Sequence, residues 1–466
     1  MPIPPDLAFA SIRTLGDHLR CGRLTSVELT RFFLKRLARL GPKFNAVVTV
    51  TARQAFRQAQ RADRELACDN ARGPLHGIPF GVKDLLATRG VPTTWGAAPY
   101  KARVIDEDAT VIVRLREAGA VLAAKLAMVE IAGGMGYRQA NASFSGPGLN
   151  PWNTSRWSGG SSSGPGSAVA AGLVPFAIGS ETWGSIVTPS AFCGITGLRP
   201  TYGRVSRHGA MALSWTMDKL GPMARTADDC GLLLGTIAGP DPADPTASDR
   251  PYAYCATGLP RSPFRLAVVK GAVDHVQPEV KKNYEASLAV LRRFACIDEI
   301  ELPDFPYNTV AGTLIDAEMS AAFEGMVTSG DVWELTAPED RWGTQAAMMI
   351  PARDYINAMR IRGRIGRVID PLFAPYDAVV TPTRATVAYP LGRAFDEYAA
   401  GRHSTSIGAA ANVAGLPAIT LPNGFGENHL PTGLQFTGRA FDENRLIAVA
   451  NTYQETTNWH RKQPPV

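Results

Sequence analysis

The first 70 residues alternate apolar and polar positions with the period of surface helices. Apolar residues recur at helical spacing over residues 7–20, and Thr25 with Glu28 forms a capping box that opens a second helix. That helix is expected to stop at Gly41-Pro42, and a third, more polar helix covers residues 51–66. We expect these three helices to pack on the outside of the main body.

The pattern changes after residue 73, where short apolar runs bounded by Gly and Pro predict buried strands. Residues 78–82 form one such run, and it delivers Lys83 and Asp84 directly from its end. A helix follows at residues 108–118, and then a second strand at 120–124 that ends at Lys125. Alternation of strand, helix and strand indicates an α/β fold with a mixed or parallel sheet.

The second half of the chain continues this alternation. Strands are predicted at residues 264–269, 299–302, 378–381, 409–422 and 434–437, and helices from residue 226, at 277–294, 354–373 and 443–456. Residues 238–263 are rich in Pro, Asp, Ala and Ser and are typical of an exposed connection. Residues 307–353 carry few sheet signals, so we expect a variable, substrate-facing segment there, inside a single domain that spans residues 1–466.

The central stretch, residues 157–200, combines two glycine- and serine-rich runs with small apolar residues. A flexible linker would not carry this much alanine and valine between its glycines. Glycine allows positive φ angles and lets the backbone approach a ligand closely. We therefore predict two tight loops joined by a buried helix or strand, and the serines held in these loops are candidates for chemistry.

Composition and charge narrow the classes of function. Residues are 45% hydrophobic and 19% charged, and the net charge of +6 is spread along the chain, which disfavours a nucleic-acid partner. The six cysteines form no CxxC pair, which disfavours a zinc site and a disulfide framework. The N-terminus lacks a signal-peptide pattern and no stretch approaches the roughly 18 apolar residues of a membrane span. We expect a cytoplasmic protein without a membrane partner.

Serine is a weak nucleophile until a base removes its proton, and two activation schemes are open. Ser162 in Gly160-Ser161-Ser162-Ser163-Gly164 fits a nucleophile elbow, which needs an acid and a histidine downstream. The available histidines, none in a recognisable setting, are His208, His403, His429 and His460. Alternatively, burial lowers the pKa of Lys83, and the neutral amine accepts a proton relayed between two serines. Lys125, at the end of the next strand, is the rival base.

Several blocks occur in a characteristic order along the chain. They read GIPFGVKD, GGSSSG, GSETWGSI, PSAFCGITGLRPTYGRVS, NVAGLPAITLP and PTGLQFTGRAF, and Ser161 and Ser185 lie 24 residues apart (185 minus 161). With these blocks the chain resembles the amidase signature family over nearly its whole length. The resemblance implies a large mixed β-sheet flanked by helices on both faces.

The resemblance also implies a Ser–Ser–Lys triad. Ser185 would be the nucleophile, Ser161, preceded by a cis peptide bond, would relay the proton, and Lys83 would be the base. The oxyanion would be held by the backbone N–H groups of Thr182, Trp183, Gly184 and Ser185. Ser162 and Glu181 would support these groups from behind. The implied chemistry passes through an acyl-enzyme and requires no metal and no cofactor.

The chain departs from the family pattern around the nucleophile. Trp183 replaces a glycine, Val187 replaces an arginine, Glu181 replaces an aspartate, and Ser163-Gly164-Pro165 alters the glycine run. Losing the arginine is expected to remove a charge partner of Glu181 or of a neighbouring acid.

Four tryptophans lie in or beside the motif blocks, namely Trp95, Trp157, Trp183 and Trp215. If they line the site, the pocket is broad and aromatic and favours aryl or other bulky apolar substrates. The alternative is that two or more of them are plain core residues.

Other charged residues near the blocks have structural alternatives too. Asp84 and Glu130 are candidate acids, but structural hydrogen bonding is the simpler interpretation. Arg362 would meet a carboxylate substrate, as in the glutaminase-type members of the family, or it lies on the solvated face of a basic helix.

These residues predict a hydrolase that cleaves the C–N bond of linear amides, with small-molecule amides, esters and carbamates (urethanes) as substrates, and aryl carbamates and anilides preferred. One alternative is a partner-dependent, glutaminase-type A subunit of an amidotransferase, against which Trp183 and the missing arginine count. Another is an inactive scaffold, against which the intact triad counts. A homodimer is common in the resembling family.

Overall fold

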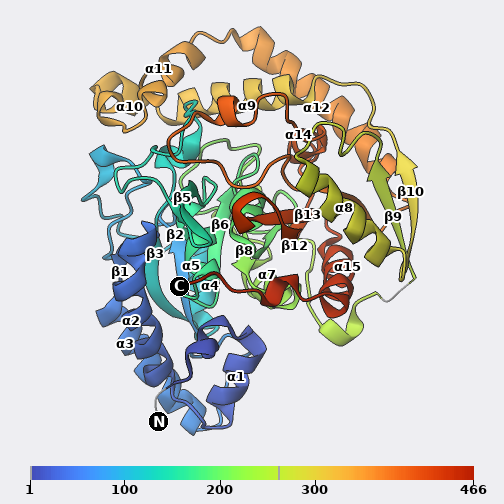
Figure 1. The fold of residues 1–466 in the computed structure, drawn as a ribbon. Coiled ribbons are helices and arrows are strands. Elements are labelled where there is room, and N and C mark those ends of the chain that lie inside the picture. The colour runs from blue at the N-terminus through green and yellow to red at the C-terminus, as the bar shows by residue number, and fades with distance from the viewer. Residues whose placement is uncertain (1–2, 261–262) are drawn as a thin grey trace.

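The computed structural model describes residues 3–260 and 263–466, and its centre is one mixed β-sheet (Figure 1). In the described residues eleven strands form this sheet, in the order β1-β3-β2-β6-β8-β7-β12-β13-β11-β9-β10, and β4 and β5 form a separate ribbon. The strands are β1 (Val47–Val50), β2 (Pro79–Lys83), β3 (Val121–Leu126), β4 (Leu149–Asn150), β5 (Asn153–Trp157), β6 (Ala177–Glu181), β7 (Thr196–Arg199), β8 (Lys219–Ala224), β9 (Phe264–Val269), β10 (Ala295–Ile300), β11 (Ala378–Pro382), β12 (Ala418–Phe425) and β13 (Pro431–Thr437).

Parallel pairing surrounds β2, the strand that carries Lys83. Strand β2 pairs in parallel with β3 on one side and with β6 on the other. All residues of these three strands are buried, as expected for parallel strands covered on both faces. The carboxyl ends of β2 and β6 therefore lie at the same edge, and this brings Lys83 close to the loop that follows Glu181.

Helices cover both faces of the sheet. They are α1 (Ile12–Arg20), α2 (Ser26–Phe44), α3 (Ala52–Ala67), α4 (Thr110–Glu117), α5 (Ser163–Ala170), α6 (Val187–Cys193), α7 (Ala227–Ile237), α8 (Pro278–Leu291), α9 (Tyr307–Ala322), α10 (Glu324–Ser329), α11 (Pro338–Ala347), α12 (Ala352–Phe373), α13 (Phe395–Tyr398), α14 (Ile407–Val413) and α15 (Glu443–Thr456). Neighbouring residues of β3 belong to different apolar clusters, Leu122 to one and Val121 to the other. Successive side chains of a strand point to opposite faces, so each face has its own core.

Most of the predicted elements are confirmed. The capping box at Thr25 and Glu28 is present, and the strand at Phe264–Val269 and the helix at Glu443–Thr456 have the predicted bounds. Residues 7–20 divide into a 3₁₀ turn, Pro5–Phe9, and the helix α1. The strand expected at residues 299–302 lies a few residues earlier, at Ala295–Ile300.

Two predicted boundaries are wrong. Helix α2 does not stop at Gly41-Pro42 but continues to Phe44, and it ends where Asn45 adopts a left-handed conformation with φ 47°. The first half of the strand expected at residues 409–422 is helix α14, because the alanine-rich run is a good helix former. Gly415, with φ 70°, lies in the turn after this helix, and β12 begins only at Ala418.

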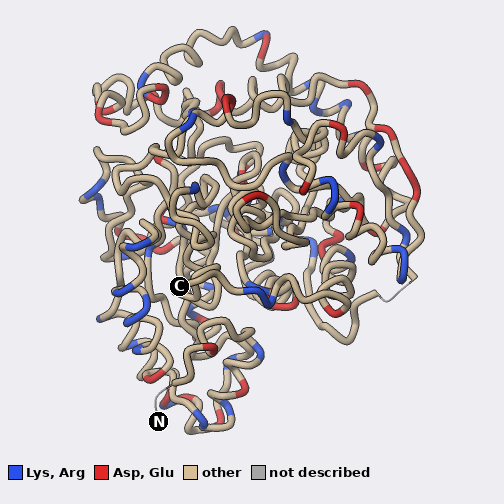
Figure 2. The backbone as a smooth tube through the Cα atoms, in the orientation of Figure 1, with Lys and Arg blue, Asp and Glu red and all other residues tan. Residues whose placement is uncertain are grey.

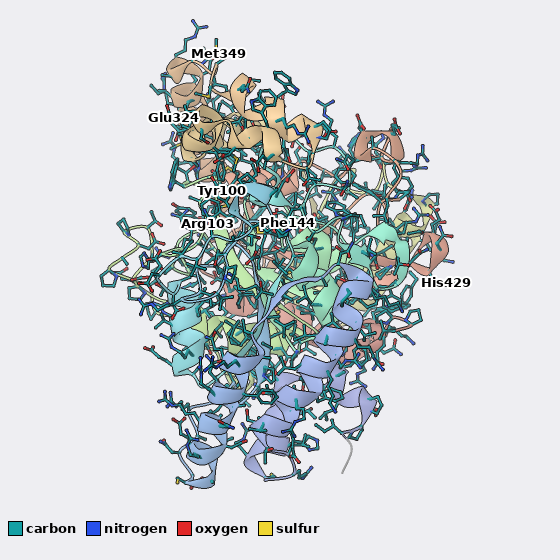
Figure 3. All side chains as sticks on the ribbon, turned by 90° about the vertical axis from the view of Figure 1, so that its left-hand side faces the viewer. Tyr100, Arg103, Phe144, Glu324, Met349 and His429 are labelled. Carbon is teal, nitrogen blue, oxygen red and sulfur yellow. The ribbon has the colours of Figure 1, made fainter. Side chains whose placement is uncertain are left out.

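Residues 307–353 form helices rather than sheet, in agreement with their lack of strand signals. Helices α9 to α12 lie together in one layer along the top of Figure 1. Figure 3 shows Glu324 and Met349 in this layer, above Tyr100, Arg103 and Phe144 of the main body. Helix α9 packs against α11, α12 and α14 and contributes residues to the cavity described below. The variability of this segment, and the single domain over residues 1–466, remain predictions.

Charged residues are distributed over the whole chain, and blue and red segments are interspersed along the tube in Figure 2. Within residues 3–260 and 263–466, no helix has both the length and the apolar character needed to cross a membrane.

Candidate active site

Lys83 is the last residue of β2 and is completely buried. Its Nζ lies 2.8 Å from Ser161 Oγ and 2.9 Å from Ser180 Oγ. In the described part of the chain no carboxylate lies within 4 Å of this amine. Burial lowers the pKa of Lys83 from 10.5 to about 7, and the more distant carboxylates of Asp218 and Glu181 act weakly in the opposite direction. Near neutral pH this lysine therefore exists partly as a neutral amine.

Ser161 lies between β5 and α5, in the loop that the sequence predicted to be tight. The peptide bond between Gly160 and Ser161 is cis, as the resemblance implied. Gly159 has φ 86°, and a Cβ there would lie 2.7 Å from Pro189 Cα, so only glycine fits this close approach of two backbones. The loop in this way holds the Ser161 hydroxyl, which is 1% exposed as a residue, against Lys83.

Ser185 lies in the loop between β6 and α6 and is half-buried. Its carbonyl accepts a hydrogen bond from the backbone N–H of Ser162 at 3.2 Å, which ties the two serine loops together. Gly184 has φ 94°, a conformation that favours glycine. Trp183 does not share this conformation, so the loop accommodates a side chain there, and the indole is 41% exposed.

Glu181 fixes the start of helix α6 behind Ser185. One carboxylate oxygen accepts the backbone N–H groups of Ile186 at 2.9 Å and Val187 at 3.1 Å, and the other accepts from Arg199 Nη1 at 2.7 Å. These partners hold the pKa of Glu181 at about 2 against the effect of its complete burial. The expected loss of a charge partner through Val187 is therefore wrong for Glu181, because Arg199 from β7 supplies the charge.

A second buried carboxylate, Asp218, braces the other side of the loop. It accepts Thr182 Oγ1 at 2.5 Å and the backbone N–H groups of Leu213 and Ser214 at 2.8 and 2.9 Å. Burial nevertheless raises the pKa of Asp218 above its ordinary value. Next to it, Lys219 Nζ donates to the Thr182 carbonyl at 3.2 Å and to Asn412 Oδ1 at 2.8 Å. The loop that carries Ser185 is thus held at both ends by buried polar groups.

A cavity of about 250 Å³ opens on Ser185. Helix α9 supplies Gly312, Ile315 and Asp316, at the i, i+3 and i+4 positions of one helical face. The remaining wall is made by Ala132, Gly133, Gly134, Gly136, Tyr137, Gly160, Thr182, Trp183 and Leu213. Among the described residues of this wall, Asp316 is the one that carries a charge. The cavity is therefore largely apolar, with an acid at one side.

Of the four residues whose backbone N–H groups are expected to hold an oxyanion, Thr182, Trp183 and Ser185 line this cavity. Gly184 lines a second cavity, which also has Trp183 in its wall.

The other three tryptophans lie outside the wall of the Ser185 cavity. Trp157 is 3% exposed and stacks on Phe395 at 4.6 Å between ring centroids, so it is a core residue. Trp95 packs under the Arg103 guanidinium at 3.6 Å. Trp215 is 46% exposed and lines an adjacent cavity of about 180 Å³ that shares Thr182 and Leu213 with the first.

The alternative chemistry around Ser162 lacks its histidine. Ser162 Oγ donates to the Ser180 carbonyl at 3.2 Å, and among the residues that the structure describes no histidine bonds to it. His429, for example, lies at the right-hand edge of Figure 3.

The remaining charged candidates have structural partners. Lys125 forms an ion pair with Asp84 at 3.0 Å. Glu130 accepts the backbone N–H groups of Thr336 and Ala337, both at 2.8 Å. Arg362, on α12, donates to the carbonyls of Thr216 and Val413, so the helix layer reaches the main body through it, and it is not part of the wall of the Ser185 cavity.

Sequence reasoning misses several groups that shape the site, namely Ser180, Arg199, Asp218, Lys219 and Asn412. Ser180 directly precedes Glu181 at the end of β6. It lies in the same motif block as Ser185, and the resemblance assigns a role only to Ser185. Asp218 and Lys219 stand next to each other before an apolar strand, and such a charged pair at the start of a buried strand is the one signal that points to them.

Comparisons with known proteins identify the family of the chain. The family model described as Amidase matches residues 28–447. The A subunit of glutamyl-tRNA(Gln) amidotransferase from Roseiflexus sp. (strain RS-1) is 40% identical in an alignment of 481 positions, gaps included, which covers 97% of this chain and 98% of that protein. The native peptide amidase from Stenotrophomonas maltophilia has a TM-score of 0.86 at 30% identity, with 99% of both chains covered. The A subunit of glutamyl-tRNA(Gln) amidotransferase from Thermotoga maritima has a TM-score of 0.81 at 27% identity, covering 98% of this chain and 97% of that one. The chain therefore belongs to the amidase signature family.

Proposed function

We propose that this protein hydrolyses the C–N bond of linear amides through an acyl-enzyme on Ser185. The observation that carries the proposal is the contact of 2.8 Å between Lys83 Nζ and Ser161 Oγ, made by a lysine whose pKa is lowered to about 7 and which has no ion-pair partner in the described residues. A buried amine of this kind is a base matched to neutral pH.

The proposed reaction begins with Ser185 Oγ attacking the carbonyl carbon of the amide. Its proton passes to Ser161 Oγ while the proton of Ser161 passes to neutral Lys83, so that Lys83 becomes an ammonium and Ser161 stays neutral. Collapse of the tetrahedral intermediate breaks the C–N bond, and the proton returns through Ser161 to the leaving nitrogen, which departs as a neutral amine. Water then attacks the ester on Ser185 through the same relay and releases the acid.

Backbone N–H groups of the loop from Thr182 to Ser185 stabilise the negative charge of the intermediate through hydrogen bonds in this proposal. The loop is held by Glu181 at its helical end and by Asp218 through Thr182, so these donors need no reorganisation during the reaction. Pre-oriented donors of this kind contribute about 2.7–4 kcal/mol each to transition-state stabilisation.

The lining of the Ser185 cavity favours substrates that are neutral or cationic and largely apolar. Trp183, Tyr137 and Ile315 offer aromatic and aliphatic surface, and Asp316 disfavours an anion. Aryl amides, esters and aryl carbamates are all accessible by the same acyl-enzyme route, and the aromatic wall favours aryl groups.

The names of the relatives favour a second candidate, a glutaminase subunit that works within an amidotransferase. Curated relatives with 33 to 40% identity over 97% or more of this chain are named as the A subunit of glutamyl-tRNA(Gln) amidotransferase. Free glutamine carries a carboxylate, and the described wall of the cavity on Ser185 offers no cation to meet it, while Arg362 is occupied by backbone carbonyls. For this reason the small-molecule amidase is our first candidate.

One assay separates the two candidates. The purified chain is incubated with benzamide, phenylacetamide or glutamine, and ammonia is measured, with Ser185→Ala as the matched control. The first candidate predicts ammonia from an aryl amide by the chain alone, and hydroxamate formation when hydroxylamine intercepts the acyl-enzyme. Ammonia released from glutamine but from neither aryl amide, and released only after partner subunits are added, would establish the second candidate instead.

A further inference from the structure

A second, larger cavity has Trp183 in its wall, as the Ser185 cavity does. Its volume is about 380 Å³, and Trp183, Gly184, Val187 and Thr188 form the wall nearest the nucleophile loop. Much of the remaining wall comes from the end of β11 and the segment after it, and from the loop before α14. The main polar residues of the whole cavity are Arg199, Thr381, Arg384, Thr386, Arg402 and His403. Apart from Arg199, which pairs with Glu181, the proposed hydrolysis uses none of these side chains.

The charge of this wall is one-sided. Three arginines and a histidine line the cavity, and no described residue of its wall is an aspartate or glutamate. Arg199 is neutralised by Glu181 at 2.7 Å, but Arg384 and Arg402 have no carboxylate within 4 Å in the described ranges. Arg384 donates to the Tyr389 hydroxyl at 2.8 Å, and Arg402 donates to the Tyr398 carbonyl at 3.4 Å. Neither contact neutralises a cation.

Hydrogen-bonding capacity around the same cavity is also unused. Arg199 Nη2, Thr381 Oγ1 and Thr386 Oγ1 belong to residues at most 4% exposed, and they have no partner among the described residues. Arg384 Nε and Thr405 Oγ1, also from the cavity wall, are in the same condition. Buried polar groups are nearly always paired in native proteins, so a cluster of unpaired ones around one cavity points to a ligand.

We propose that this cavity binds a carboxylate or phosphate group of a small molecule. Guanidinium groups bind such oxyanions through two parallel N–H bonds, and hydroxyls of threonine complete the set of donors. An anion would neutralise Arg384 and Arg402, to which the described residues offer no counter-charge. Because Trp183 forms a wall of both cavities, the anion would lie beside the loop that carries Ser185.

Calorimetric titration tests the proposal without relying on hydrolysis. The Ser185→Ala protein is titrated at constant ionic strength with succinate, with inorganic phosphate and with succinamide, which has the shape of succinate but no charge. We expect one of the two anions to bind and succinamide not to bind. Succinate binding would identify a carboxylate as the ligand group, and phosphate binding a phosphate.

Two variants and a matched control decide the location. Arg402 is exposed, so Arg402→Gln is expected to fold normally and to weaken anion binding at least tenfold. Arg353→Gln removes an arginine of the same sign that is 82% exposed and lies outside the cavity, and it should bind like the parent. Arg384→Gln, checked for folding by circular dichroism, should weaken binding further than Arg402→Gln.

Three results would overturn the proposal. These are the absence of binding by both anions, equal binding by the parent and Arg402→Gln, and equal weakening in Arg402→Gln and Arg353→Gln, which would indicate general electrostatics. Because the parent here lacks the Ser185 hydroxyl, failure of the proposed hydrolysis leaves these outcomes unchanged.

Discussion

Two lysines at the ends of adjacent strands are alike in burial but differ in their partners. Lys83 ends β2 and Lys125 is the penultimate residue of β3, and both are completely buried. Lys125 pairs in register with Val82, so Lys83 and Lys125 point to opposite faces of the sheet. Burial lowers the pKa of both lysines, so the difference between them lies in the groups that their amines contact.

The partners differ in charge. Lys125 Nζ forms an ion pair with Asp84 at 3.0 Å and donates to the Leu86 carbonyl and Thr93 Oγ1 at 2.7 and 2.8 Å, so its charge is matched. Among the described residues, the Lys83 amine forms hydrogen bonds only with the hydroxyls of Ser161 and Ser180. A buried ammonium with a carboxylate holds structure together, whereas a buried amine between hydroxyls is free to exchange a proton.

Removing Lys83 gives the largest effect that this contrast predicts. Lys83→Met should lower kcat/KM on an aryl amide by about 10³-fold or more, because general-base catalysis contributes about 10²–10⁴-fold and no other base contacts Ser161 in the described residues. Initial rates at saturating and limiting substrate measure it. The variant should stay folded, since methionine fills the same space without a charge; near-normal kcat/KM in a folded Lys83→Met would break the comparison.

Removing Lys125 should instead damage the fold. Lys125→Met leaves Asp84 buried without its cation, a loss expected to lower the free energy of unfolding by about 3–5 kcal/mol. Urea unfolding followed by fluorescence measures this. The double variant Lys125→Met with Asp84→Asn should recover part of the loss, and a double variant as unstable as the sum of its single changes would contradict the ion-pair role.

The pH dependence of kcat/KM and of the free energy of unfolding reports on the protonation of Lys83. Burial lowers the pKa of Lys83 to about 7, and the proposed reaction uses only the neutral amine, so kcat/KM should fall about tenfold per pH unit below 7 and level off above it. In the unfolded chain Lys83 keeps its proton up to about 10.5, so this group makes the free energy of unfolding rise with pH between about 7 and 10.5. Lys83→Met should lack that rise; an activity profile that is flat between pH 5 and 8 would argue against a neutral Lys83.

Ser180 gives the smallest predicted effect. Ser180→Ala removes one hydrogen bond to Lys83 and leaves the contact with Ser161, so kcat/KM should change by about tenfold or less, corresponding to roughly 0.5–1.5 kcal/mol. Parallel measurement of Ser161→Ala, expected to lose far more, supplies the scale. Equal losses in the two variants would mean that the relay passes through either hydroxyl.

The sequence predicts the positions of Lys83 and Lys125 at strand ends, but it does not predict which of them is paired with a carboxylate. Short apolar runs locate β2 and β3, so Lys83 and Lys125 are both identified as lysines at strand ends. Motif blocks single out Ser161 and Ser185. Which lysine is paired depends on Asp84 and Thr93 folding back onto β3, and local periodicity carries no such information.

Contacts between distant segments escape sequence reasoning for the same reason. The partner of Glu181 is Arg199, and Lys219 is fixed by Asn412, which is 193 positions away. Helix α14, which carries Asn412, is a short apolar run, and periodicity alone does not distinguish a buried strand from a buried helix in such a run. The arginine-lined cavity beside Trp183 depends on the same long-range packing.

The most direct test of the central claim is peptide mapping after treatment with a fluorophosphonate, which forms a covalent adduct with an activated serine. The account predicts the adduct on Ser185 in the parent protein, its loss in Lys83→Met, and its retention in Ser162→Ala. An adduct on Ser162, or undiminished labelling of Ser185 without Lys83, would contradict the claim that Lys83 activates Ser185 through Ser161.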